Sequence, residues 1–288
     1  MQVTMLDDVA PRPRRVAVGE FDGVHLGHRE VIAGNDTVLT FDPHPLAVIR
    51  PEAAPRLLTS LAAKAELVRA LGVREMVVIG FDESFAAQTP EDFIADVLVD
   101  RLGATHVSVG QNFRFGHGAA GDTDMLAADP RFETRVVDMV SVGGQVVSSS
   151  HIRSLVSAGE VGEAGRLLGS PFQVRGEVIT GDRRGRELGF PTANIVPDPE
   201  LIRPGNGVYA ARADGRCAAV NVGVRPTFDD GQGVLVEAYL LDTDENLYGR
   251  QLAVDFLARL RGEQRFDSVE SLVEQMHRDV AHVRALCG

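Results

Sequence analysis

Short apolar runs alternate with longer segments in the first part of the chain. The runs are bounded by Gly, Pro or Asp and lie at residues 16–18, 37–41, 76–81, 107–109 and 136–139. Such short apolar runs are typical of fully buried strands in a parallel sheet. Between them we expect helices at residues 61–71, 90–102 and 152–158. Strands that alternate with helices predict a doubly wound α/β domain.

The pattern changes after Pro171. Five further strands are expected, separated by turn-rich segments, at residues 174–180, 207–213, 217–222, 234–241 and 252–256. Because no helix is expected between them, this half predicts a small antiparallel β-barrel. We place the boundary near Gly169, which gives domains at residues 1–170 and 171–288.

A final helix is expected at residues 268–286. Its apolar stripe consists of Val269, Leu272, Val273, Met276, Val280, Val283 and Leu286. A stripe of this kind usually packs on a core, so we expect the helix to cover the barrel; binding to a partner protein is the alternative.

The composition of the chain argues against several classes of protein. The 288 residues are 44% hydrophobic and 24% charged, as expected of a soluble protein with two domains. No apolar run approaches the roughly 20 residues that span a bilayer, and residues 1–10 do not resemble a secretion signal. The formal charge of −12 argues against a nucleic-acid partner. Cys217 and Cys287 are far apart in sequence, so neither a disulfide framework nor a metal cluster is expected. We therefore expect a cytoplasmic protein without a nucleic-acid or membrane partner; the sequence does not indicate its oligomeric state.

The segment GEFDGVHLGH at residues 19–28 follows the first expected strand. His25 and His28 lie where this strand ends and a helix begins, the place where open α/β sheets bind ligands and helix N-termini favour phosphate. Two imidazoles three residues apart can stabilise charge that develops when an α-phosphate is attacked. The alternative is a structural turn with two exposed histidines.

A second motif, GDRRGRELGFPTAN, covers residues 181–194, and the chain has no P-loop sequence. Thr192 and Asn194 offer hard oxygen ligands that suit Mg²⁺, and two residues apart they face the same side of an extended segment. Gly181 and Gly185 would let backbone N–H groups approach phosphate. Glu237 interrupts the apolar strand at residues 234–241, so it is either an outward-facing residue or a functional one.

These motifs together resemble bacterial bifunctional riboflavin kinase/FAD synthetases. The first motif is similar to the signature of their nucleotidylyltransferase domain, and it is supported by TFDPHP at residues 40–45, VGQNFRFG at 109–116 and SSSHIR at 148–153. Residues 181–194 resemble the riboflavin kinase signature. The resemblance implies a Rossmann-like nucleotidylyltransferase domain followed by a β-barrel kinase domain with a C-terminal helix.

The resemblance also implies roles for individual residues. Glu237 would be the catalytic base of the kinase, His25 and His28 would act in adenylyl transfer, and Thr192 and Asn194 would hold the metal ion. The residues expected to bind ATP or phosphate in the first domain are Gly19, Phe21, Asp22, Gly23, Asn112, Ser149, Ser150 and Arg153. In the kinase domain they are Gly181, Asp182, Gly185, Asn221 and Arg225. For Ser149 and Ser150, helix capping alone is the alternative.

Two segments depart from simple expectations. Between His28 and Thr37 the family has a helix of several turns, but here only a stub at residues 29–33 remains, so either the helix is truncated or a segment is absent from the sequence.

The segment GHGAAG at residues 116–121 fits GxGxxG, yet residues 111–115 separate it from the preceding strand. We interpret it as a mobile loop on the phosphate side rather than a nicotinamide-binding turn.

The leading hypothesis is a bifunctional enzyme of flavin-cofactor biosynthesis. With ATP and Mg²⁺ it would phosphorylate riboflavin to FMN, and with a second ATP it would convert FMN to FAD and pyrophosphate. The alternatives are a riboflavin kinase with a degenerate first domain, and a non-catalytic flavin-binding regulatory protein. A cytidylyltransferase is disfavoured because it would leave the kinase motif unexplained.

Overall fold

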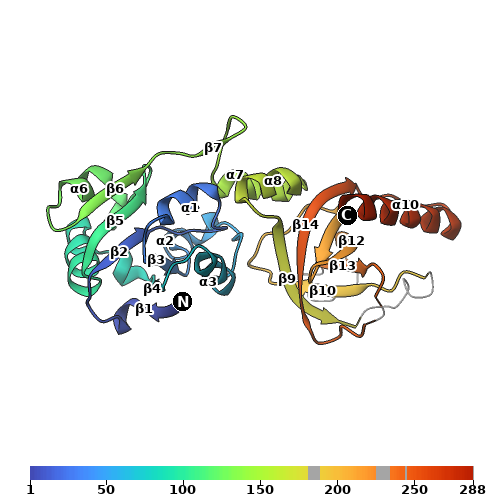
Figure 1. The fold of residues 1–288 in the computed structure, drawn as a ribbon, viewed down its shortest axis with the longest axis horizontal. Coiled ribbons are helices and arrows are strands. Elements are labelled where there is room, and N and C mark those ends of the chain that lie inside the picture. The colour runs from blue at the N-terminus through green and yellow to red at the C-terminus, as the bar shows by residue number, and fades with distance from the viewer. Residues whose placement is uncertain (181–188, 225–233, 244, 288) are drawn as a thin grey trace. The chain divides into compact units, whose positions relative to one another are not determined.

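The computed structural model of the chain describes residues 1–180, 189–224, 234–243 and 245–287 (Figure 1). The chain forms two compact units, Met1–Ser149 and Ser150–Gly288.

The first unit contains a six-stranded parallel sheet with the strand order β1-β4-β3-β2-β5-β6. Its strands are β1 (Gln2–Met5), β2 (Arg14–Val18), β3 (Thr37–Asp42), β4 (Glu75–Gly80), β5 (Ala104–Gly110) and β6 (Glu133–Val137). The five expected strands are confirmed, and β1 is an additional edge strand. From β2 the chain adds β3 and β4 on one side and β5 and β6 on the other, so the sheet has a topological switch point between β2 and β5. In such sheets ligands bind beyond the carboxyl ends of the strands at this point.

Helices and helical turns connect the strands of this sheet. They are η1 (Leu6–Asp8), α1 (Leu26–Ile32), α2 (Pro45–Ile49), η2 (Pro51–Ala53), α3 (Leu61–Ala70), α4 (Glu83–Ala86), α5 (Pro90–Asp92), the π-helical η3 (Phe93–Arg101), η4 (His117–Ala119) and α6 (Thr123–Ala128). The helices expected at residues 61–71 and 90–102 correspond to α3 and to α5 with η3. A small hairpin of β7 (Ser141–Val142) and β8 (Gln145–Val146) completes the unit.

Apolar side chains cover both faces of the sheet. On β2, Val16 and Val18 belong to one buried cluster, whereas Ala17, between them, belongs to another. Val77 and Val78 of β4 divide between the same two clusters. Because successive side chains of a strand point to opposite faces, this division confirms the doubly wound arrangement.

The short segment after His28 forms a complete helix of two turns. Helix α1 has seven residues, and Val31 and Ile32 near its end are buried. Ala33 caps the helix and Gly34, with φ of +79°, turns the chain toward β3. The helix is therefore truncated relative to the expectation of several turns, yet it is anchored in the core.

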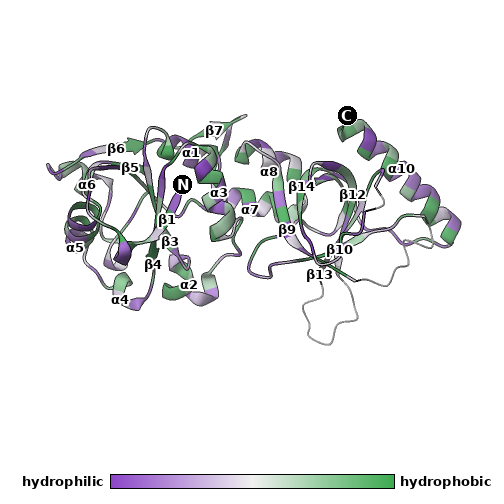
Figure 2. Ribbon diagram, turned by 60° about the horizontal axis from the view of Figure 1, so that its bottom comes forward, coloured by the Kyte–Doolittle hydropathy of each residue, from purple (hydrophilic) through white to green (hydrophobic). Residues whose placement is uncertain are grey.

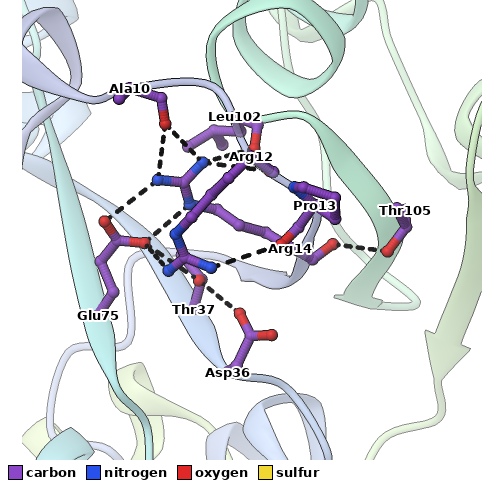
Figure 3. A network of polar contacts seen from close by, with 9 residues as sticks. All are labelled: Ala10, Arg12, Pro13, Arg14, Asp36, Thr37, Glu75, Leu102 and Thr105. Atoms are coloured by element: carbon purple, nitrogen blue, oxygen red, sulfur yellow. Dashed lines mark hydrogen bonds and ion pairs between the residues drawn. The ribbon is translucent and has the colours of Figure 1, made fainter.

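An ion-pair network lies at the start of β2, at the opposite end of this strand from the histidine motif. Arg14 is 2% exposed and its Nε lies 2.8 Å from Glu75 Oε2. Figure 3 shows its guanidinium group between Glu75 and the carbonyl groups of Ala10 and Leu102. Arg12 also reaches Glu75, at 2.7 Å. The network links β2 and β4 across the intervening strand β3.

The second unit begins with two helices, α7 (Ser149–Ala158) and α8 (Val161–Leu168). The helix expected at residues 152–158 begins three residues earlier, and α8 is an additional helix. Helix α8 packs against strands of the barrel, β9 and β14. The boundary expected at residues 170 and 171 assigns both helices to the first domain, whereas the compact second unit includes nearly all of both. The functional boundary stays a prediction.

The barrel is closed, antiparallel and six-stranded, in the order β10-β13-β12-β11-β14-β9. Its strands are β9 (Phe172–Ile179), β10 (Ala193–Pro197), β11 (Gly207–Ala213), β12 (Arg216–Val224), β13 (Val234–Leu240) and β14 (Gln251–Arg261). The predicted barrel and its five expected strands are confirmed. Strand β10 was not predicted, because its residues lie within and directly after the kinase-like motif.

Helix α10 (Val269–Cys287) lies against β11, β12 and β14, as the sequence predicts. Val280 and Val283 pack in the cluster beneath it, but Val269 and Leu286, which belong to the expected stripe, are 56% and 52% exposed. The stripe that covers the barrel is thus shorter than predicted. Figure 2 shows apolar and polar segments alternating along α10.

Candidate active sites

The turn between β2 and α1 is tightly folded. Phe21, Gly23 and Val24 all have positive φ, at 52°, 83° and 42°. A Cβ on Gly19 would lie 3.1 Å from the Phe21 ring, so this close approach requires glycine or a displaced ring. The N–H groups of Gly19 and Gly23 already donate to Leu39 O and Thr59 Oγ1. The expected phosphate-binding role of the two glycines stays a prediction, and it would depend on the shape of the turn.

Asp22 holds this turn in place. Its carboxylate is buried and accepts hydrogen bonds from the backbone N–H groups of Leu58, at 2.8 Å, and Thr59, at 3.1 Å. Ser149 Oγ donates to the carbonyl oxygen of Asp22 at 2.9 Å. Arg153 Nη2 donates to the hydroxyl of Ser150, the third serine of SSSHIR, at 3.4 Å. The structure thus gives Asp22 and Ser149 structural contacts, and their roles toward phosphate stay predictions.

His25 and His28 form a stacked pair. Their ring centroids are 3.5 Å apart, and His25 Nδ1 accepts the backbone N–H of His28, which caps α1. Burial lowers the pKa of His28, and the nearby His25 and Lys64 lower it further. His28 is therefore a neutral imidazole near neutral pH. Its Nδ1 is buried and has no hydrogen-bond partner within the described part of the chain.

A cavity of about 960 Å³ opens beside this histidine pair. Four of the predicted residues line it, namely Gly19, Phe21, His28 and Asn112. Aromatic side chains also line it, among them Phe85, Phe93, Phe113 and Phe115. The cavity therefore combines polar groups with apolar rings that suit a flat ring system.

The GxGxxG segment lines the same cavity at Gly116 and Gly118. His117 N donates to Gln88 O at 2.7 Å, and Phe115 and Gly121 exchange backbone hydrogen bonds that close the loop. The segment thus borders the cavity, and its place on the phosphate side and its mobility stay predictions.

Two charged residues near the turn were not predicted as site residues. Glu20 lines the cavity, and burial raises its pKa to about 7. Lys64 on α3 is 5% exposed and donates to Thr40 Oγ1 at 3.1 Å. A sequence signal for Lys64 does exist, because this lysine interrupts the apolar face of its helix.

The barrel brings three predicted residues into one row. Asn194 of β10 pairs with Glu237 of β13, and Glu237 pairs in turn with Asn221 of β12. Because their inward neighbours such as Ala193 and Val236 are buried in the barrel, the three polar side chains share its outer face. Asn194 is 5% exposed, and its Oδ1 has no hydrogen-bond partner among the described residues.

The residues beside this row fit a bound cation. A buried amide oxygen without a partner is costly unless a donor or metal ion meets it. Thr192 lies two residues before Asn194 and is partly buried, and the register neighbour of Asn194 is a carboxylate, so hard oxygen donors gather here. Phe190 packs against Tyr239 and His277 and anchors the segment ahead of Thr192. Gly181, Asp182, Gly185 and Arg225 lie outside the described residues.

Comparisons with known proteins cover both halves of the chain. The sequence profile of the FAD synthetase family matches residues 8–151, and that of the riboflavin kinase family matches residues 168–287. A protein of Listeria monocytogenes is 38% identical, over 94% of this chain and 91% of its own. Proteins of Escherichia coli K12 and Bacillus subtilis are 36% and 33% identical, over 95% and 92% of this chain and 92% and 89% of their own. All three are named bifunctional riboflavin kinase/FMN adenylyltransferase.

Among the solved structures that resemble the whole chain is a protein of Streptococcus pneumoniae described as a macrolide-efflux protein. It has a TM-score of 0.90, 28% identity and coverage of 99% of each chain. In the part of the present chain that the structure describes, no helix has the length and apolar character needed to cross a membrane.

Proposed function

The chain belongs to the family of bifunctional riboflavin kinase/FMN adenylyltransferases, and from that premise we propose which of its residues carry each reaction. The enzyme acts in flavin-cofactor biosynthesis. It transfers the γ-phosphoryl group of ATP to riboflavin, which gives FMN, and it joins FMN to the AMP part of a second ATP, which gives FAD and pyrophosphate. The complete first turn of α1 and the cavity beside His28 disfavour a degenerate first domain.

For adenylyl transfer we assign the site to the cavity of the first unit. A phosphate oxygen of FMN attacks the α-phosphorus of ATP, and the bond from that phosphorus to the departing pyrophosphate breaks. The neutral His28 imidazole can donate one hydrogen bond to an oxygen that gains charge in this step. The stacked His25 ring and the helix cap fix the orientation of His28. The aromatic side chains that line the cavity would contact the flavin ring.

For phosphoryl transfer we assign the base to Glu237. Its carboxylate would accept the proton of the riboflavin 5′-hydroxyl as that oxygen attacks the γ-phosphorus and ADP leaves. The alignment of Asn194, Glu237 and Asn221 across three strands is the observation that carries this assignment. Thr192 and Asn194 would hold Mg²⁺, which when bound neutralises phosphate charge.

The substrates riboflavin, FMN and ATP follow from these two reactions. The cytoplasmic location and the lack of nucleic-acid or membrane partners stay predictions from the sequence.

One incubation tests the proposed function. The protein is mixed with riboflavin, ATP and Mg²⁺, and the products are separated by chromatography over time. We expect FMN to appear first and FAD later. FMN that never becomes FAD would support a kinase with a degenerate first domain, and no product would contradict both enzyme hypotheses.

A further inference from the structure

Lys64 is the only lysine in a chain with 29 lysine and arginine residues. It is also buried, with a side chain that is 6% exposed. Its Nζ donates to Thr40 Oγ1 at 3.1 Å and lies 4.0 Å from Glu20 Oε2. A buried ammonium group is costly unless it is paired, so these contacts are needed for its burial. The other 28 of these residues are arginine, and at this buried position the compact ammonium group fits between Thr40 and Glu20.

The surroundings of Lys64 are acidic on one side. Glu20, Asp22 and Asp42 all favour its charged form, while burial opposes that form and gives the larger effect, so the pKa of Lys64 is lowered. His28 is also close enough for Lys64 to lower its pKa. The ammonium group is therefore near both the carboxylates and the imidazole proposed for adenylyl transfer.

Glu20 connects Lys64 to the cavity. Glu20 lines the cavity beside His28, and its Oε1 is buried without a hydrogen-bond partner in the described residues. Its backbone carbonyl accepts the hydroxyl of Thr40, the same hydroxyl that Lys64 contacts. Lys64 is therefore tied to the phosphate-facing turn through both the side chain and the backbone of Glu20.

An anionic side chain at this place is unfavourable for substrates that carry phosphate. Like charges in a partly buried cavity repel each other strongly, because water screens them poorly. Above pH 7, where Glu20 loses its proton, its carboxylate would oppose the entry of ATP and FMN if no cation were near. Lys64 is the nearby cation, and it does not itself line the cavity within the described residues.

We propose that Lys64 is a positioning residue for adenylyl transfer, which offsets the charge of Glu20 and holds the turn between β2 and α1 in its ligand-binding form. This role rests on the proposed adenylyltransferase function. It acts through Glu20 and Thr40 and needs no contact between Lys64 and substrate.

A double-mutant cycle tests the proposal. Lys64→Met, Glu20→Gln and the double variant are compared with the wild type for kcat/KM of FAD formation from FMN, ATP and Mg²⁺. Lys64 lowers the pKa of Glu20, so Lys64→Met raises it further, and the assays are therefore run well above pH 7, where Glu20 is anionic. There Lys64→Met leaves an uncompensated carboxylate, and we expect a loss of about 10–100-fold, mainly through a higher KM. Glu20→Gln should cost less, and the double variant should recover at least about fivefold relative to Lys64→Met. A double variant no better than Lys64→Met would overturn the proposal.

Two controls separate charge balance from general damage. FMN formation from riboflavin, in the second unit of the same polypeptide, should stay within about twofold of wild type in every variant. Arg14→Met removes another buried basic group, from the opposite end of β2, and should reduce stability while kcat/KM of the folded protein is unchanged. A wild type that forms no FAD would contradict the proposed function itself; a wild type that forms FAD, with Lys64→Met equally active, would contradict only the role of Lys64.

Because the chain has one lysine, the NMR signal of a labelled lysine side chain can come only from Lys64 and needs no assignment. Protein labelled with ¹³C at lysine Cε gives a single side-chain signal, which reports the charge of Lys64 during a pH titration. Glu20 favours the charged form of Lys64, so Glu20→Gln should shift the titration to lower pH. This result does not depend on the folding of Lys64→Met. A signal that titrates identically in wild type and Glu20→Gln would overturn the coupling of the two residues.

Discussion

The two units arrange polar groups for phosphate chemistry in different ways. In the first unit, a continuous turn between β2 and α1 brings a neutral imidazole and buried charges to the end of a parallel sheet. In the barrel, residues far apart in sequence meet because the register of three antiparallel strands aligns Asn194, Glu237 and Asn221. The first site depends on the local conformation of one segment. The second depends on the pairing of the whole sheet.

The buried groups without partners also differ between the units. In the first unit, His28 Nδ1 lies beside a histidine and a lysine, whereas in the barrel, Asn194 Oδ1 lies beside a carboxylate. The first environment suits direct contact with phosphate oxygen, and the second suits a metal ion between the protein and phosphate. The two units therefore offer different groups to phosphate, an imidazole in the first and a metal-binding oxygen in the second. A substitution in one unit should leave the reaction of the other unit active.

Glu237→Gln gives the largest expected effect. The amide cannot accept the proton, so FMN formation should fall about 10²–10⁴-fold, while FAD formation from added FMN stays near wild type. Rates of both reactions, measured separately, check this. Glu177→Gln is the matched control, since Glu177 is an exposed carboxylate of β9 outside the row. If Glu237→Gln kept kinase activity within a few-fold, Glu237 would not be the base.

His28→Ala should produce the opposite pattern. Loss of one donor to developing phosphate charge should lower FAD formation about 10²–10³-fold and leave FMN formation intact. His106→Ala, which removes a histidine paired with the exposed Glu133, is the control in the same unit. Equal FAD yields from His28→Ala and wild type, assayed with FMN, ATP and Mg²⁺, would remove His28 from the mechanism.

Glu75→Gln tests the stability of the first unit rather than its chemistry. It removes the carboxylate that pairs with the buried Arg14, so we expect a loss of about 3–5 kcal/mol in the free energy of unfolding. Glu133→Gln, in an exposed pair, should cost about 0–1 kcal/mol. Denaturant unfolding of both variants checks the difference, and equal losses would contradict the assigned role of the network.

The same network predicts a dependence of stability on pH. Hydrogen bonds from Arg14 hold the pKa of Glu75 below its ordinary value. The resulting stabilisation is present above the unfolded pKa of a glutamate and is lost as the pH falls through the lower, folded value. The difference in the free energy of unfolding between wild type and Glu75→Gln should therefore shrink as the pH falls. A constant difference between the two proteins across acidic pH would argue against this assignment.

A fragment of residues 150–288 should fold and phosphorylate riboflavin with activity within a few-fold of the full chain. A fragment of residues 171–288, which starts at the boundary predicted from the sequence, lacks α8, whose Val161 and Leu167 are buried. We expect it to retain the barrel and the activity but to unfold at a lower denaturant concentration, because removal of α8 exposes apolar surface of β9 and β14. Insoluble or inactive fragments, with an active full chain, would show that the second unit is not independent.

Some features could be predicted from the sequence because they are local. The apolar runs of β2 to β6 and the motif around His25 and His28 need only short-range patterns. Strand β10 could not be predicted by periodicity, since it begins within a motif and contains the polar Asn194. Helix α8 was also missed, although its short apolar face packs on the barrel.

The role of Lys64 required three-dimensional information. Its position on the apolar face of α3 was visible in the sequence, but its partners Glu20 and Thr40 come from other elements. The alignment of Asn221 with Glu237 likewise depends on register, which spacing along the chain does not determine. Motifs predicted which residues matter, and the fold was needed to show which of them meet.

The central claim is that the two reactions occur at separate sites, so that each can be removed without the other. A mixture of Glu237→Gln and His28→Ala proteins tests this claim most directly. Incubated separately with riboflavin, ATP and Mg²⁺, the first variant should make almost no FMN and the second should accumulate FMN without FAD. Mixed in equal amounts, they should form FAD, because FMN released by one is adenylylated by the other. A mixture that forms no FAD, although each variant retains its own remaining activity, would contradict the claim.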